Sequence, residues 1–87
     1  MAYRAEIHRA AQKQVLSLSR EARVEVAQAI DGLGREPRPF GCRKLRATAL
    51  WRARVGRYRV VYTVDNEARL VTVVKVAARR EDTYKGV

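Results

Sequence analysis

The sequence predicts a small α+β domain in which a helical hairpin packs on one face of a mostly antiparallel four-stranded sheet. Two observations carry this prediction. In four short segments the apolar residues alternate with polar ones or form a run, which predicts four strands. Between the first and the second of these segments, apolar residues recur at helical spacing in two stretches, which predicts two helices. The order is therefore strand, helix, helix, strand, strand, strand. The 87 residues allow one small core, so we expect a single domain over residues 1–87.

In the first half of the chain, the spacing of apolar residues changes from that of a strand to that of a helix. Residues 3–7 alternate between apolar and polar side chains, which predicts that strand. Apolar residues at helical spacing over residues 9–18 predict a first helix, which serines then interrupt. Ser19, followed by a glutamate in the next turn, is a candidate N-cap of a second helix whose apolar stripe runs from Val26 to Leu33. We expect Gly34 to end this helix.

The second half of the chain contains most of the predicted sheet. Residues 35–41 hold both prolines and predict a loop, while residues 42–49 fit either a loop or an edge strand. Leu50–Val55 and Tyr58–Val64 are rich in β-branched and aromatic residues and flank a two-residue glycine turn, which predicts a hairpin. Leu70–Val76 has few polar residues and predicts a central fourth strand.

The charge balance indicates a polyanionic partner. The chain has 19 Lys and Arg against 9 Asp and Glu, a net charge of +10, and four of its arginines lie within residues 52–59 of the predicted hairpin. The alternative is a basic protein whose arginines serve only solubility. A single cysteine, Cys42, allows no internal disulfide, and no apolar run is long enough for a signal peptide or a membrane span. We therefore expect a cytoplasmic protein.

The strand predicted at residues 50–55 carries the strongest functional signal. Arg52 and Arg54 fall on one side of it, whereas Trp51, Ala53 and Val55 fall on the other. One face therefore packs and the other is charged. A guanidinium binds phosphate through two hydrogen bonds and stays charged at physiological pH, so this pattern indicates a phosphate-containing ligand.

Further cations extend this site if the last three strands are neighbours. Arg59 shares a side with Val61, and Lys75 shares a side with Arg79, so four or five cations can gather at one point of the sheet. Such a site binds a phosphodiester and stabilises the extra negative charge of a pentacovalent transition state. The alternative is a set of independent, solvated arginines.

The sequence lacks the motifs of metal-dependent nucleases. It has no paired carboxylate cluster, no HExxH motif and no glycine-rich phosphate loop, so we expect no metal and no cofactor. RNA can be cut without a metal because its 2′-hydroxyl is an internal nucleophile. Arginine is a poor base at neutral pH, which leaves Lys75 and Tyr84 as candidate proton carriers. A nucleophilic pair of Cys42 and His8 is disfavoured by their separation along the chain.

Three blocks of the chain resemble one protein family. They are Lys44-Leu45-Arg46, the block WRARVGRYRVVY from Trp51 to Tyr62, and the block VAARREDTY from Val76 to Tyr84. With the strand and two helices before them, they make nearly the whole chain similar to the RelE/ParE superfamily of bacterial toxin–antitoxin systems.

The resemblance to the RelE branch implies a ribosome-dependent messenger-RNA endonuclease, an mRNA interferase. Such an enzyme cuts the A-site codon by 2′-hydroxyl attack without a metal and thereby inhibits translation. The catalytic residues that the resemblance implies are Arg52, Arg54, Arg59, Arg79 and Tyr84. The RNA-binding residues expected beside them, for messenger RNA and 16S ribosomal RNA, are Lys44, Arg46, Arg57, Lys75, Arg80 and Lys85. The family further implies an acidic, amphipathic antitoxin that covers the cationic face.

The chain departs from the family pattern at two places. Ala77-Ala78-Arg79 stands where many relatives have glycine-histidine-arginine, and Arg52 and Arg54 stand where lysines are frequent. Two alternative functions therefore stay open. One is a ParE-like toxin that inhibits DNA gyrase without cutting nucleic acid, and the other is a catalytically weak homologue that acts as a binding module.

Overall fold

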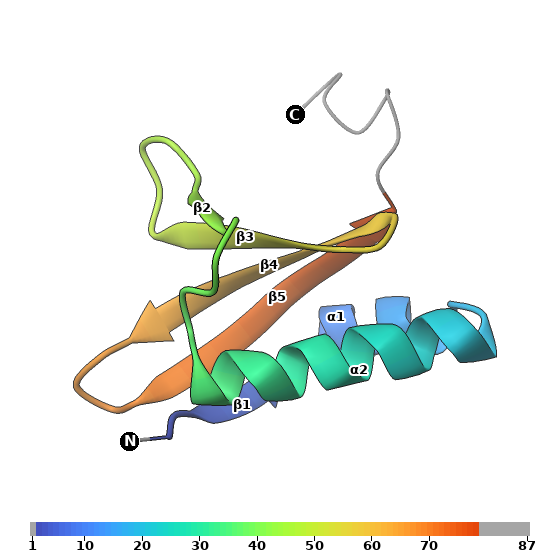
Figure 1. Cartoon of the computed structure of the whole chain (residues 1–87), viewed down its shortest axis with the longest axis horizontal. Coiled ribbons are helices and arrows are strands. Elements are labelled where there is room, and N and C mark those ends of the chain that lie inside the picture. Colours follow the sequence, from blue (N-terminus) through green and yellow to red (C-terminus); the bar gives the residue numbers. More distant parts are fainter. Residues whose placement is uncertain (1, 79–87) are drawn as a thin grey trace.

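The computed structural model describes residues 2–78, which form two helices and five strands (Figure 1). In chain order these elements are β1 (Arg4–Ile7), α1 (Arg9–Leu16), α2 (Arg20–Arg35), β2 (Arg43–Lys44), β3 (Leu50–Val55), β4 (Tyr58–Asp65) and β5 (Leu70–Ala78). The predicted α+β class and the predicted order of elements are confirmed. Within the described residues, no helix is long and apolar enough to cross a membrane.

The sheet has five strands in the order β1-β5-β4-β3-β2, so the prediction of four strands was wrong by one. The additional strand is β2, two residues of the segment 42–49, which pair with Arg52 and Trp51 of β3. Two residues are too few to show a period of alternation, which is why the sequence left this segment open. β1 runs parallel to β5 and every other pair is antiparallel. The connection between β1 and β5 contains both helices and the strands β2, β3 and β4, so it is long enough for the crossover that a parallel pair requires.

The helix ends follow from local hydrogen bonds. Ser19 caps α2 as predicted, because its Oγ accepts from the N–H of Ala22 at 3.2 Å. The Nδ1 of His8 caps α1 in the same way. Gly34 does not end α2, which continues to Arg35. Its backbone instead lies close to the residue before β1: Tyr3 N–H donates to the Gly34 carbonyl, and a Cβ on Gly34 would lie 3.0 Å from the Tyr3 carbonyl oxygen. This close approach favours glycine at the position.

Both helices cover the same face of the sheet, and the core lies between them. The helices contribute Ala11, Val26, Ile30 and Leu33, and the sheet contributes Ala53, Val55, Val60, Tyr62, Val71, Val73 and Val76. All of these sheet residues share one side because strand side chains alternate and paired residues face the same way. The opposite side of β3, β4 and β5 is left without a helix among the described residues (Figure 1). Any functional surface of the sheet lies on this open side.

Candidate functional site

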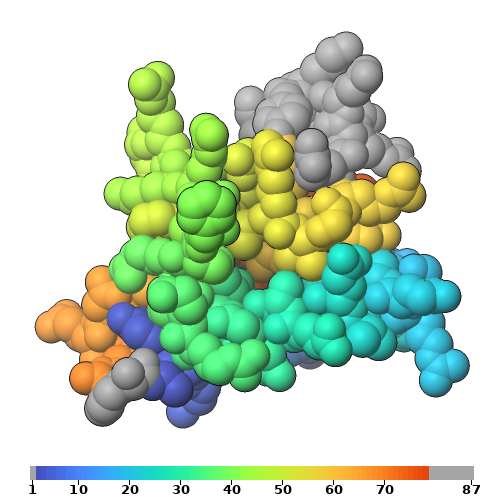
Figure 2. Space-filling view, viewed as in Figure 1, coloured from blue at the N-terminus to red at the C-terminus, as the bar shows by residue number. Residues whose placement is uncertain are grey.

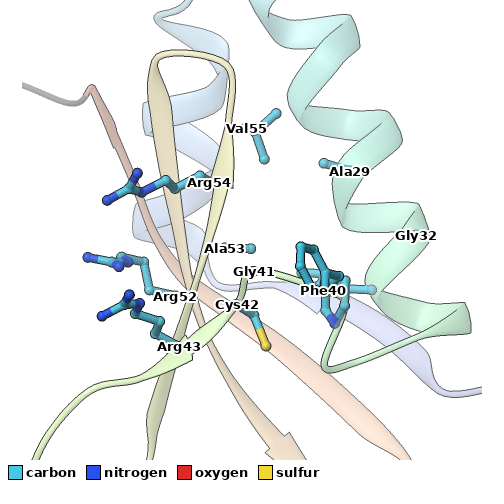
Figure 3. A pocket seen from close by; sticks show the side chains of 12 residues that line it. Ala29, Gly32, Phe40, Gly41, Cys42, Arg43, Arg52, Ala53, Arg54 and Val55 are labelled. Carbon is cyan, nitrogen blue, oxygen red and sulfur yellow. The ribbon is translucent and has the colours of Figure 1, made fainter.

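The open side of the sheet gathers arginines from three strands. Arg52 and Arg54 of β3 point away from α2, whereas Ala53 and Val55 point toward it (Figure 3). Across the sheet, Arg54 pairs with Arg59 of β4. Arg43 of β2 pairs with Arg52 and also lies on the open side, as Figure 3 shows. The predicted alternation of β3 is thus confirmed, and Arg43 joins the cluster without having been singled out from the sequence.

A β-bulge brings a fifth cation to the same side. Val61 pairs with Lys75 while its neighbour Tyr62 pairs with Val73, so Val74 is an extra residue in β5. Regular alternation from Val73 would turn Lys75 toward the helices. The bulge changes the phase of the strand, so that Lys75 is exposed on the open side and the next residue, a valine, enters the core.

We call the surface formed by these five side chains the cationic face. Its members are Arg43, Arg52, Arg54, Arg59 and Lys75. Arg59 differs from the others because only 7% of its surface is exposed, and its strand β4 is flanked by β3 and β5. A guanidinium keeps its charge even when it is buried. Arg59 is therefore a fixed positive charge set into the floor of the cationic face.

A groove borders this face on the outer edge of β3. It has a volume of about 550 Å³ and lies between β3 and the second half of α2, with the loop of residues 36–42 at one end. Its walls include Ala29 of α2, Ala53 and Val55 of β3, and Phe40, whose side chain is fully exposed to solvent (Figure 3). Three arginines of the cationic face form its rim. The groove thus joins an apolar surface to a charged one.

The loop of residues 36–42 is fastened to the sheet by Tyr62. This side chain is fully buried, and its hydroxyl donates a hydrogen bond of 2.7 Å to the Pro37 carbonyl oxygen. Burial is the largest cause that raises the pKa of the Tyr62 hydroxyl, and nearby Cys42 raises this pKa further. Next to it, the guanidinium of Arg38 lies 5.3 Å from the centre of the Trp51 ring and donates to Asn66 Oδ1 at 3.0 Å. These contacts hold the loop beside the groove.

The remaining predicted residues lie elsewhere. Lys44 pairs with Trp51, which places its side chain on the helix side of the sheet, away from the cationic face. Arg46 is exposed in the loop after β2, a segment that projects from the body of the molecule (Figure 2), and Arg57 is exposed in the β3–β4 turn. The predicted residues Arg79, Arg80, Tyr84 and Lys85 lie outside the described residues. Within residues 2–78, no group of three or more His, Cys, Asp or Glu is arranged to hold a metal ion.

The signal that could have found Arg43 is weak. It lies in a two-residue strand, and its face follows only from its pairing with Arg52. The role of His8, by contrast, is accounted for locally, since its ring accepts a hydrogen bond at the start of α1.

Comparison with known proteins identifies the family. Residues 5–83 match the model of a family described as ParE toxin of type II toxin–antitoxin system, parDE. A chain in the crystal structure of the archaeal RelE–RelB complex from Pyrococcus horikoshii is 33% identical, with a TM-score of 0.82, over 93% of this chain and 99% of that one. The chain belongs to the RelE/ParE toxin superfamily. No curated protein matches the sequence.

Other RelE/ParE structures share the fold. A chain of the toxin–antitoxin complex RelBE2 from Mycobacterium tuberculosis is 28% identical with a TM-score of 0.78, over 91% of this chain and 100% of that one. The YoeB/ParE toxin from Agrobacterium tumefaciens has a TM-score of 0.74 over 88% of this chain and 99% of that one, but at 13% identity this likeness shows the fold alone. The chain is thus a toxin of the toxin–antitoxin type, and its fold occurs in structures named RelE and in one named ParE.

Proposed function

We propose that this toxin inhibits translation by cutting messenger RNA on the ribosome without a metal ion. The observation that carries the proposal is the cationic face, on which three arginines and one lysine from β2, β3 and β5 lie around the buried Arg59 of β4. Such a surface binds the RNA backbone through its phosphates. The phosphate carries more negative charge in the transition state than in the substrate, so the cations attract the transition state more strongly. An enzyme accelerates a reaction when it binds the transition state more tightly than the substrate.

The chemistry follows from the substrate as much as from the protein. In RNA the 2′-hydroxyl lies next to the phosphodiester, so the enzyme has to align it in line with the leaving oxygen and neutralise the phosphate. Arg59 is suited to hold the phosphate because its strand is flanked on both sides and its side chain is buried. Arg52 and Arg54 lie beside it and approach the same phosphate from β3. DNA lacks the internal nucleophile and is not a substrate.

We further propose that an antitoxin binds this toxin and blocks the cationic face. Similar toxins have been crystallised in complexes named RelE–RelB and RelBE2. The net charge of +10 favours an acidic partner. The groove has apolar walls and a rim of arginines, so it favours a partner segment with both apolar and acidic side chains.

Primer extension on messenger RNA from programmed ribosomes tests the proposal, with naked RNA as the comparison substrate. The wild type is expected to cut the codon in the A site, and Arg54→Ala and Arg59→Ala are expected to lose most of this activity. Arg20→Ala, which removes an exposed arginine at the start of α2, is the matched control. Thermal unfolding shows whether each variant is folded. Cutting that persists in both site variants, or no cutting by the wild type, would contradict the proposal.

The second candidate function is inhibition of DNA gyrase. It is favoured by the family model, which is that of a ParE toxin and spans residues 5–83. In this case the protein would bind gyrase and would not cut RNA. A supercoiling assay with purified gyrase separates the two functions: loss of supercoiling at toxin concentrations that leave messenger RNA intact would favour gyrase, and intact supercoiling would remove this candidate.

A further inference from the structure

The bulge in β5 interrupts the regular pairing of this strand with β4. Val71 and Val73 are fully buried, and regular alternation would bury Lys75 with them. A buried ammonium group is strongly disfavoured, so the extra residue Val74 lets the core continue at Val76 while Lys75 reaches the open side. Bulges of this kind are frequent beside active sites, where they redirect one side chain.

Helix α1 stabilises the strand at this point. β1 ends at Ile7, opposite Val73, so beyond that residue β5 has no strand on its outer side among the described residues. The Oε1 atom of Gln14 takes the place of a strand there and accepts a hydrogen bond of 2.7 Å from the Val76 N–H. The backbone that follows the bulge is therefore held on both sides, and the direction of the Lys75 side chain is set by the fold.

This direction places Lys75 across the cationic face from Arg52. In the row that runs across the sheet, Arg52 pairs with Val61 and Val61 pairs with Lys75. Two strand spacings, roughly 10 Å, separate the two cations. The long side chains of Arg52 and Lys75 can therefore reach the same phosphate above the short side chain of Val61. Arg59 is the diagonal neighbour of Lys75 on the same side. A phosphate held by the arginines thus lies within reach of the lysine.

We propose that Lys75 donates the proton to the leaving 5′-oxygen in the RNA cleavage proposed above, on which this inference rests. Lys75 is the one member of the cationic face that is not an arginine. A guanidinium keeps its protons at all working pH values, whereas lysine ammonium groups serve as acids and bases in enzymes.

The proposed step conserves atoms and protons. The 2′-oxygen forms a bond to phosphorus, its proton passes to water, and the bond from phosphorus to the 5′-oxygen breaks. The Lys75 ammonium gives one proton to that oxygen and regains one from water. The products are a 2′,3′-cyclic phosphate and a 5′-hydroxyl.

The test uses Lys75→Arg, which keeps the positive charge but removes the transferable proton. Single-turnover cleavage is measured on ribosomes with two messenger RNAs, one normal and one with sulfur in place of the bridging 5′-oxygen. A thiolate leaves without being protonated, so the second substrate needs no proton donor. Lys13→Arg, a change of an exposed lysine on α1, is the matched control.

We expect Lys75→Arg to slow cleavage of the normal RNA by about 100-fold or more. Binding to the ribosome and cleavage of the sulfur substrate are expected to stay as in the wild type. Equal cleavage of normal RNA by Lys75→Arg and the wild type would overturn the assignment while the proposed function stands. Equal losses on both substrates would show that Lys75 only contacts phosphate, which also overturns it. A wild type that cuts neither RNA overturns the proposed function and this inference together.

Discussion

The hydroxyl of Tyr62 fastens the loop beside the groove, and we predict that its removal lowers the stability of the protein markedly. Tyr62 has no exposed surface, and its hydroxyl donates to the carbonyl oxygen of Pro37, which is also buried. Tyr62→Phe keeps the ring and its packing but leaves this carbonyl without its donor. Because water does not reach a buried carbonyl freely, the lost hydrogen bond is not replaced.

The size of the effect follows from this geometry. A buried acceptor that loses its donor costs about 1–3 kcal/mol in the free energy of unfolding. The entropy of unfolding, at about 2.1 cal/mol/K per residue, is roughly 0.18 kcal/mol/K for a chain of 87 residues. Dividing the first by the second predicts that Tyr62→Phe lowers the melting temperature by about 5–16 °C.

Differential scanning calorimetry at neutral pH measures this change, and Tyr58→Phe is the control. Tyr58 lies in the same strand and is half-buried, and no hydrogen bond of its hydroxyl is found within residues 2–78. We expect Tyr58→Phe to melt close to the wild type. If the two variants melt at the same temperature, the hydrogen bond to Pro37 does not contribute to stability and the reasoning fails.

Three further predictions concern pH, glycine and salt. Burial raises the pKa of the Tyr62 hydroxyl above its value in the unfolded chain, so the contribution of this hydroxyl to the free energy of unfolding is complete below about pH 10 and is lost as the pH rises further. Urea unfolding of the wild type and Tyr62→Phe at several pH values measures this loss. Gly32→Ala, with open space at its Cβ, is expected to stabilise α2 by about 0.5–1 kcal/mol, whereas Gly34→Ala meets a backbone carbonyl of the segment before β1 and is expected to destabilise; thermal melts would contradict this if both raised the melting temperature. Arg54→Ala is expected to reduce the salt slope of binding to single-stranded RNA by about 0.7, in filter binding at several salt concentrations, while Arg20→Ala leaves it unchanged; equal slopes would place the RNA elsewhere.

Elements with a strong local signal were predicted well. The hairpin of β3 and β4 needs only a two-residue glycine turn between two β-rich segments, and its bounds were predicted to within one residue. The capping role of Ser19 depends on an N–H three residues away. The alternation that separates Arg52 from Ala53 is likewise a property of the strand itself. In each case the deciding interaction lies within a few residues of the chain.

Features that depend on distant contacts were missed or misread. The spacing of Leu18 extended the first helix in prediction, but α1 ends at Leu16, and Leu18 packs against the core from the connection between the helices. The position of Gly34 predicts a helix stop, but α2 continues to Arg35, and the Gly34 backbone lies against Tyr3, the residue before β1. Neither contact has a signature near these residues in the sequence.

The fold class, the charged side of β3 and the family resemblance could be predicted from the amino-acid sequence, because they depend on local periodicity and on which residue types follow one another. Which cations lie together on the sheet depends instead on how the strands pair. The register between β4 and β5 contains a bulge that brings Lys75 onto the cationic face, and the pairing of β2 with β3 brings Arg43 there. The burial of Arg59 likewise depends on the strands that flank it. Side-chain direction within one strand follows from its own backbone, whereas the register between strands follows from the packing of a shared core.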